Sequence, residues 1–482
     1  MTRTYLGLVV VATAGLLAAC GGDDGGRASD SASATVTATV TATMTATMTA
    51  SDGSTTQDTA TGSGSATDST AGSVSDSLTG GTAPTTGEVS ATGSSTGAVT
   101  ITTVGTDSGP DSSTGSSTGT STTGLPPDLG DPCAGGMGEP EFSYIWVANS
   151  SQGTISKIDT QTLVEKGRYI VRPDSAGSPS RTSVNLTGDV VVANRSGGMA
   201  KVYARADDCV ESNGMPGIQT STDATVLPWG VEECVAWFTP LSYVSQRPAA
   251  WTQGTFNKDT CGWDNQKVWS SGVIDAVQPG VDILRLNGAT GVVEDKINIP
   301  SINHGYYGIY GAAVDKSGNM WGSQLGQGQL LFVDGQTLQY KTWPMVAGGY
   351  GMTVGASGYV WTCSTNASRF DPMTEQWQTL SVGGSGGCME DDNGTLYMSQ
   401  GGAGVLAVDV ETLQVKATYP LPQYVHGISI DYYGYVWGVS IGAQAYRIDI
   451  NNPGAFQTFN NLVGAYTYSD MTGVALSNVS PQ

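Results

Sequence analysis

The stretch QYVHGISIDYYGYVWGVS (423–440) decides the fold, because its pattern occurs three more times earlier in the chain. A glycine precedes four strand-forming residues, a turn follows around a second glycine, and an aromatic residue stands ten positions after the first glycine. The same spacing occurs in YGAAVDKSGNMWGS (310–323), YGMTVGASGYVWTC (350–363) and GGCMEDDNGTLYMS (386–399). Glycine supplies the positive φ that a tight turn between antiparallel strands requires. Each copy therefore predicts a β-hairpin.

A third strand and a further turn follow each hairpin. In LLFVDGQTLQYK (330–341) and VLAVDVETLQVK (405–416), an apolar strand ends at an aspartate, and a polar turn leads into a fourth strand. Four antiparallel strands that recur roughly every 36 to 52 residues are typical of a β-propeller blade. We expect the recurring aspartates to form Asx turns; they are Asp159, Asp334, Asp371, Asp409 and Asp449.

Seven positions mark the second strand of successive blades, so the sequence predicts an all-β, seven-bladed β-propeller over 131–482. These positions are Trp146, Val191, Trp269, Trp321, Trp361, Tyr397 and Trp437. The long gap after the second of them predicts an insertion at about 207–265, centred on 234–263 in the third blade. No first strand precedes the first blade, and MTGVALSN (471–478) has the pattern of a first strand with nothing after it. We expect these two ends to complete one blade and close the ring.

Residues 1–19 have the pattern of an export signal, with Arg3 before a short apolar run. The segment LAAC (17–20) resembles a bacterial lipobox, which implies cleavage before Cys20 and lipidation of its thiol. The alternative is ordinary secretion with an incidental cysteine. Residues 20–130 are rich in Ser, Thr and Gly, and their low apolar content predicts a disordered linker. By resemblance to the usual sorting rule for such lipoproteins, Gly21 in place of an aspartate implies the outer membrane or cell surface rather than inner-membrane retention.

Charge and cysteine content narrow the possible partners. The net charge is −22 and basic clusters are absent, which argues against nucleic acid and against docking on anionic lipid. Apart from Cys20, the cysteines are even in number, as expected for disulfides in an exported chain; they are Cys133, Cys209, Cys234, Cys261, Cys363 and Cys388. Their pairing stays open, although Cys363 and Cys388 fall on neighbouring blades. We expect a monomer without a metal or cofactor, and DDNG (391–394) is interpreted as a turn rather than a calcium loop.

The candidate site is the residue just before each first-strand glycine, where the chain enters the innermost strand near the channel mouth. Across the blades the aligned residues are Tyr310, Tyr350, Gly386, His426, Thr472, Trp229 and Ser180. Nearby lie further rings, namely Tyr306, Tyr307, Trp343, Tyr424, Tyr468 and His304. Amphipathic rings around a wet mouth suit a carbohydrate, a peptide or a partner protein. The alternative is that the rings plug the channel and hydrogen-bond to one another.

The quoted repeats resemble those of streptogramin B (virginiamycin B) lyase, and YIWVANSSQGTISKIDTQTL (144–163) is similar to YVTN and NHL-type repeats. The lyase resemblance implies a lactone-opening elimination that uses a histidine base, a glutamate and a magnesium ion. His426 matches that histidine, whereas Ser440 stands at the glutamate position. We therefore expect a surface lipoprotein that binds a ligand without catalysis. The alternative is a lyase or hydrolase that uses His426 with His304 or the neighbouring tyrosines, and only this alternative requires magnesium.

Overall fold

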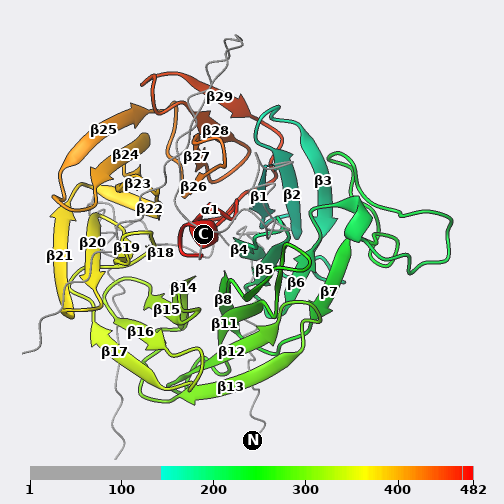
Figure 1. Ribbon diagram of the computed structural model, residues 1–482, viewed down its shortest axis with the longest axis horizontal. Coiled ribbons are helices and arrows are strands. Elements are labelled where there is room, and N and C mark those ends of the chain that lie inside the picture. The colour runs from blue at the N-terminus through cyan, green and yellow to red at the C-terminus, as the bar shows by residue number, and fades with distance from the viewer. Residues whose placement is uncertain (1–142, 469, 481–482) are drawn as a thin grey trace, which may run out of the picture. The chain divides into compact units, whose positions relative to one another are not determined.

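The computed structural model describes residues 143–468 and 470–480. In Figure 1 these residues form a ring of β-sheets around a central axis, and we call the space along this axis, which side chains occupy, the channel. The ring contains seven sheets, which confirms the predicted all-β, seven-bladed propeller. The predictions for the export signal at 1–19, Cys20, the linker at 20–130 and Cys133 lie outside the described residues.

Each blade is an antiparallel sheet whose strands run in chain order from the channel to the rim. The first blade has β1 (Tyr144–Asn149), β2 (Thr154–Asp159) and β3 (Glu165–Ile170), and the second has β4 (Pro179–Val184), β5 (Val190–Asn194), β6 (Met199–Val202) and β7 (Val235–Thr239). The third has β8 (Ser245–Trp251), β11 (Lys267–Val273), β12 (Val281–Asn287) and β13 (Val293–Ile299). The fourth has β14 (Ile309–Val314), β15 (Met320–Gln324), β16 (Gln329–Val333) and β17 (Tyr340–Pro344), and the fifth has β18 (Gly351–Val354), β19 (Val360–Cys363), β20 (Asn366–Asp371) and β21 (Gln376–Ser381). The sixth has β22 (Gly384–Glu390), β23 (Thr395–Gln400), β24 (Gly404–Asp409) and β25 (Val415–Pro420), and the seventh has β26 (Gly427–Ile430), β27 (Val436–Val439), β28 (Ala445–Ile448) and β29 (Phe456–Phe459).

The seven predicted anchors are all buried, and six of them lie on the second strand of their blades. The other, Trp146, lies on β1, which takes the second place in the first blade once the end of the chain pairs with it. Large flat rings fill the wedge between twisted sheets and account for much of the buried apolar surface. Their indole N–H groups also find acceptors, as buried tryptophans require. Trp437 donates to Asp431 in the turn of its own blade at 2.8 Å, and Trp269 donates to the Gly318 carbonyl of the next blade at 3.0 Å. The aromatic series therefore serves packing between blades.

The aspartates after the third strands form Asx turns, as predicted. Asp334 Oδ1 accepts the backbone N–H of Gln336 and of Thr337 at 2.9 and 2.7 Å. Asp159 and Asp409 accept from their turns in the same way. These bonds satisfy backbone donors that the strand ladder leaves open, so the carboxylates are structural.

The predicted insertion at 207–265 is two separate insertions. Residues 203–234 connect β6 to β7 of the second blade and contain the 3₁₀ turn Ala206–Asp208; in Figure 1 this green loop projects from the outer rim. A second insertion, the hairpin β9 (Thr255–Asn257) and β10 (Gly262–Asp264), lies between β8 and β11 of the third blade. The prediction of one insertion over 234–263 is wrong, because β7 and β8 are regular blade strands within that range.

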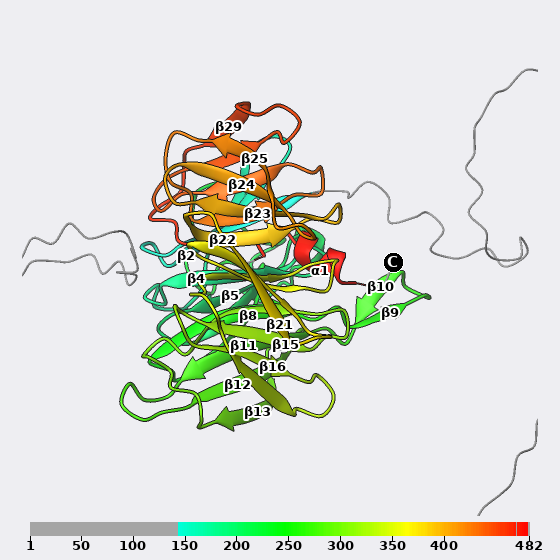
Figure 2. The ribbon, with the colours of Figure 1, turned by 90° about the vertical axis from the view of Figure 1, so that its left-hand side faces the viewer.

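Chain closure occurs as predicted, but with different residues. The N–H of Tyr466 donates to the Ala148 carbonyl at 3.0 Å, and that of Trp146 donates to the Met471 carbonyl at 2.8 Å, so Tyr466 and Met471 lie along the channel side of β1. The expectation of a strand over 471–478 is wrong, because Val474–Asn478 is the helix α1. Gly473 has φ +91°, which an extended strand does not accommodate, and Asp470 accepts the N–H groups of Thr472 and Gly473. Figures 1 and 2 show α1 on the channel axis at one face of the ring.

Two disulfides join described cysteines. Cys209–Cys234 closes the insertion of the second blade, and Cys363–Cys388 links β19 to β22 of the neighbouring blade, as the sequence indicated. Cys261 is also disulfide-bonded. Such bonds persist in oxidising compartments, which indicates an extracellular or periplasmic location. Within 143–468 and 470–480, no helix is long and apolar enough to cross a membrane.

Candidate functional site

The strand registers identify the residue that enters the channel in each blade. His426 and Tyr350 donate their backbone N–H to the carbonyls of Val439 and Cys363, two positions after their second-strand anchors. Tyr466 makes the equivalent bond to Ala148 in the first blade, so Tyr466 occupies the position that the sequence assigned to Thr472.

The third blade needs a similar correction. Ala250 pairs with the anchor Trp269, and the entry residue three positions earlier is Arg247 rather than Trp229. A β-bulge between Ser270 and Gly272 shifts the register at this point, and no glycine marks the strand start, so the sequence pattern carries no sign of it.

Trp229 and Thr472, which the sequence placed at strand entrances, lie away from the mouth in the structure. Trp229 belongs to the insertion of the second blade, where its ring packs edge-on against Phe238 at 5.8 Å and stays 36% exposed. Thr472 Oγ lies next to Ser429 Oγ at 3.0 Å, at the end of the closing segment that precedes α1. Neither residue joins the aromatic group at the strand entrances.

Four tyrosines fill the mouth of the channel, and we call Tyr310, Tyr350, Tyr466 and Tyr468 the tyrosine cluster. All four are buried. Ring centroids lie 5.2 Å apart between Tyr310 and Tyr350, and 4.8 Å apart between Tyr350 and Tyr468. Of these four, the sequence alignment placed Tyr310 and Tyr350 at strand entrances. Tyr466 and Tyr468 arrive on the closing segment, whose path through the channel a blade repeat does not encode.

His426 bridges the tyrosine cluster to Tyr424. Its Nε2 lies 2.8 Å from the Tyr350 hydroxyl, and its Nδ1 lies 2.9 Å from the Tyr424 hydroxyl. The Tyr424 hydroxyl also donates a hydrogen bond to the Ser385 carbonyl at 2.8 Å. Nδ1 then carries the imidazole proton and donates to Tyr424, while Nε2 accepts from Tyr350. Both ring nitrogens are therefore engaged in a buried network.

The hydroxyl chain continues beyond Tyr350. The Tyr310 hydroxyl donates to the Tyr350 hydroxyl at 3.2 Å and lies 3.3 Å from the Tyr466 hydroxyl. With Tyr466 as the donor of that last bond, the hydroxyls of Tyr466, Tyr310 and Tyr350 each donate once, and the chain ends at His426 Nε2. These hydroxyls form a cooperative network, whereas the buried hydroxyl of Tyr468 has no hydrogen-bond partner among the described residues.

Three buried arginines from the second and third blades stack on these rings. The guanidinium of Arg195 lies 4.2 Å from the Tyr466 ring centre, that of Arg181 lies 4.7 Å from the Tyr310 ring, and that of Arg247 lies 4.8 Å from the Tyr307 ring. A cation over an aromatic face is stabilised by the ring quadrupole. The mouth therefore combines phenol hydroxyls with a positive charge density, although the chain as a whole is acidic.

Of the aromatic side chains at the mouth, only those of Tyr306, Tyr307 and Tyr424 offer surface to a ligand. Tyr306 is 44% exposed, while Tyr307 and Tyr424 are half-buried. Tyr306 has φ +71° in a loop that His304 fixes, because His304 Nδ1 accepts the N–H of Tyr306 at 2.8 Å and Nε2 donates to the Gln278 carbonyl at 2.7 Å. His304 thus shapes the loop with both nitrogens. Trp343 lies in β17 at the rim of the ring, stacked on Trp321, and is not part of the mouth.

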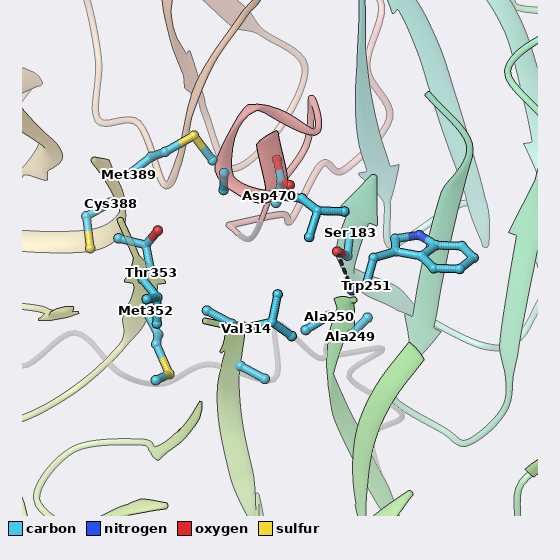
Figure 3. A pocket seen from close by; sticks show the side chains of 15 residues that line it. Ser183, Ala249, Ala250, Trp251, Val314, Met352, Thr353, Cys388, Met389 and Asp470 are labelled. Atoms are coloured by element: carbon cyan, nitrogen blue, oxygen red, sulfur yellow. Dashed lines mark hydrogen bonds between the residues drawn. The ribbon is translucent and has the colours of Figure 1, made fainter. Parts of the chain in front are cut away.

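The channel behind the tyrosine cluster is nearly filled. Figure 3 shows the side chains of Met352, Met389, Trp251 and Asp470 around a cavity of about 30 Å³, which Leu476 of α1 also lines. That volume holds about one water molecule. The described residues thus plug the channel, and a ligand at this face would contact only the outer rings.

The residues at the mouth do not fit a magnesium-assisted elimination. Ser440, which stands where the lyase resemblance requires a glutamate, is buried, and its hydroxyl donates to the Gln444 carbonyl at 2.8 Å. In the part of the chain that the structure describes, no group of three or more His, Cys, Asp or Glu side chains is placed to hold a metal ion. A magnesium ion would therefore lack carboxylate ligands at this position.

The similarity of this chain to known proteins is distant. No family model and no curated protein matches this chain. Among solved structures, a catalytically inactive virginiamycin B lyase from Staphylococcus aureus, solved with quinupristin, is similar with 12% identity and a TM-score of 0.43, covering 66% of this chain and 89% of that one. A functionally unknown protein from Desulfotomaculum acetoxidans has 11% identity and a TM-score of 0.46, covering 68% and 98%, and AztD from Citrobacter koseri has 10% and 0.44, covering 68% and 96%. Similarity at this level carries no assignment of activity.

Proposed function

We propose that this chain is a monomeric bacterial lipoprotein, anchored at the outer membrane or cell surface through Cys20, whose propeller binds a carbohydrate, a peptide or a partner protein without turning it over. The binding face is the tyrosine-rich mouth. The observation that carries the proposal is the exposed Tyr306 ring, which stands with Tyr307 and Tyr424 on a buried floor of hydrogen-bonded tyrosines. A rigid floor lowers the entropy cost of holding a ligand.

The chemistry of the mouth supports these ligand classes. Phenol rings stack on the apolar faces of sugars and on peptide side chains, and their hydroxyls exchange hydrogen bonds with polar groups. The lipid anchor rests on LAAC (17–20) alone, and the disulfides agree with export. Several acyl chains on Cys20 would hold the protein firmly at a membrane.

Catalysis by His426 is the alternative, and its environment argues against it. Both nitrogens are hydrogen-bonded and the side chain is buried, so a substrate would have to displace Tyr350 or Tyr424 to reach the imidazole. A general base needs direct reach to the proton that it removes. In addition, Ser440 stands where the lyase resemblance requires a glutamate, so the imidazole lacks that partner.

A binding screen tests the proposal. Residues 20–482 carrying Cys20→Ser, which stay off the membrane, are screened against a glycan array, peptidoglycan fragments and a peptide library. We expect Tyr306→Ala to weaken a confirmed ligand roughly threefold to tenfold, the loss of one aromatic contact. Tyr340→Ala is the matched control, because Tyr340 is 46% exposed on the outer strand β17. Equal weakening by both variants, or no ligand in any class, would contradict the proposal.

The catalytic alternative has its own readout. Turnover of a cyclic lactone with a pH profile that inflects near pH 6 to 7, lost on His426→Asn, would establish it and overturn the non-catalytic assignment.

A further inference from the structure

The hairpin β9–β10 carries a cysteine whose partner is not among the described cysteines. Cys261 is disulfide-bonded, but the other four described cysteines bond to one another. Their pairs are Cys209–Cys234 and Cys363–Cys388. The sequence has seven cysteines, so Cys20 and Cys133 are the remaining partners within the chain. A lipidated Cys20 holds its sulfur in a thioether and cannot form a disulfide, so the proposed anchor leaves Cys133.

Contacts on the α1 face bring the base of this hairpin close to the start of β1. The indole N–H of Trp146 in β1 donates to the Gly188 carbonyl at 3.1 Å, in the turn between β4 and β5. From the same turn, Asn185 donates to the side-chain oxygen of Gln266 at 3.1 Å, and Gln266 lies between β10 and β11. Figure 2 shows β9 and β10 on the side of the ring that carries α1. A single turn of the second blade therefore separates β1 from the hairpin base.

The position of Cys133 in the sequence fits this geometry better than that of Cys20. Cys133 precedes Ser143, the first described residue, by ten positions, and a chain of that length spans at most ~36 Å. Cys20 precedes Ser143 by more than ten times as many positions. Closing a longer flexible loop costs more entropy, so Cys133 is the favoured partner even when Cys20 carries no lipid.

Cys261 occupies a backbone position that suits glycine or asparagine better than cysteine. Its φ is +51°, in the left-handed region that strains most side chains. The turn is fixed by Asn257, whose Oδ1 accepts the N–H groups of Asp259 and Thr260 at 2.9 and 3.3 Å. A disulfide requires a cysteine at the tip whatever the backbone prefers, so the strain agrees with a bonded sulfur.

The bond at Cys261 differs from the other two in its exposure to solvent. Cys261 is exposed, whereas the cysteines of the two described pairs are 8% exposed or less. An attacking thiolate must reach one sulfur of the disulfide, so an exposed disulfide is reduced more readily than a buried one.

We propose that Cys133 and Cys261 form an exposed disulfide, the strap, which ties the start of the first blade to the third blade and opens in mild reductant while the two buried disulfides stay closed. The strap forms when the two thiols exchange with a protein disulfide of the exporting compartment, which takes up their two protons and two electrons and becomes a dithiol. The first blade is the one that the end of the chain completes, so the strap holds the N-terminal side of the closing blade. The bond does not depend on what the mouth binds.

Peptide mapping without reduction tests the pairing. The exported chain is extracted in detergent, its free thiols are blocked with N-ethylmaleimide, and it is digested with trypsin and Asp-N. We expect the peptide 131–157 joined to the peptide 259–263. A free thiol at Cys261, its pairing with Cys20, or a covalent dimer on a non-reducing gel overturns the proposal. The mass of the N-terminal peptide reports separately on lipidation of Cys20, so failure of the anchor and failure of the strap are distinguishable.

Graded dithiothreitol tests the order of reduction. The native chain is treated at pH 8, blocked with N-ethylmaleimide, and mapped for labelled cysteines. We expect half-labelling of Cys261 at a reductant concentration roughly tenfold or more below that of the buried pairs. The difference should disappear in the urea-unfolded chain, which is the control. Labelling of Cys209 or Cys363 before Cys261 overturns the proposal.

The double variant Cys133→Ser/Cys261→Ser tests the strap itself. The bond closes a loop of about 130 residues, so its loss should lower the melting temperature by roughly 5 to 10 °C. Mild dithiothreitol should bring the parent chain to the same melting temperature and leave the double variant unchanged. Thr260→Ser, a change at the exposed neighbouring residue, is the matched control and should melt as the parent does. A double variant that also melts as the parent does overturns the strap.

Discussion

The disulfide between Cys363 and Cys388 should contribute more to stability than the one between Cys209 and Cys234. Both bonds span a sequence separation of 25 residues. The chain-entropy model depends only on this loop length and gives each bond about 3.5 kcal/mol through restriction of the unfolded chain. Because this contribution is equal for the two bonds, a difference between them reports on the folded state.

Both pairs of cysteines are buried, but the two bonds differ in the parts of the fold that they join. Cys363 and Cys388 lie in strands of neighbouring blades and pack with Leu396, Met398 and Leu406 in a buried cluster. Their bond therefore holds an interface that the ring needs. Removal of buried sulfur atoms there adds roughly 1 to 2 kcal/mol for lost packing. We expect a loss of about 5 kcal/mol for the double alanine variant.

Cys209–Cys234 closes an insertion that leaves and rejoins one blade. The carboxylate of Glu233 independently ties this loop, since it accepts the N–H groups of Ser212, Asn213 and Gln219. Cys209 and Cys234 also pack against Val202 and Ala204, so part of the packing loss applies here too, and the loss for the Cys209→Ala/Cys234→Ala variant should lie between about 3.5 and 5 kcal/mol.

Urea unfolding of both double variants and the parent chain, followed by tryptophan fluorescence, measures the difference. Slopes of the unfolding transitions must agree before the free energies are compared. An inter-blade variant that loses less stability than the insertion variant, or less than about 1 kcal/mol, would refute the reasoning.

Two further predictions concern titration and the mouth. Burial raises the pKa of Asp470 to about 6 in the folded chain, so the folded state binds this proton more tightly than the unfolded state. The free energy of unfolding should therefore fall by at most about 3 kcal/mol as the pH rises from 4 to 6. Asp470→Asn should flatten this part of a profile of melting temperature against pH. A profile that Asp470→Asn leaves unchanged would contradict this. His426→Phe should lower the free energy of unfolding in urea by only about 1 to 2 kcal/mol. The reason is that the Tyr350 hydroxyl still bonds to Tyr310 and the Tyr424 hydroxyl still bonds to the Ser385 carbonyl. A loss above about 4 kcal/mol would show that the imidazole has a larger role.

The blades were predictable because their signals are local. A second-strand ring such as Trp321, and an aspartate such as Asp334 at the next turn, recur at fixed spacing, and each has a packing or hydrogen-bonding reason to be there. Register within a hairpin follows from the same spacing. The seven anchors and the Asx turns could therefore be located without coordinates.

The mouth was predictable only where a glycine marks the strand start. Tyr310, Tyr350 and His426 precede such glycines and were placed correctly. Arg247 lies within the bulged strand β8, which has no glycine at its start, and Tyr466 lies on a segment that pairs with β1 from the far end of the chain. Long-range pairing and bulges carry no local pattern, so these two positions needed the structure.

The path of the closing segment has a consequence for how the protein is made. Tyr466 pairs with Ala148, and Ser150 reaches the Tyr466 carbonyl across 316 positions. The first blade therefore stays incomplete, with a bare strand edge, until Tyr466 and Met471, which pair with β1, have left the ribosome and crossed the membrane. Until then a chaperone or another chain could pair with β1, since an open edge is a template for association. Nonsense mutations that remove this segment should yield chains that are cleared rather than shorter working proteins.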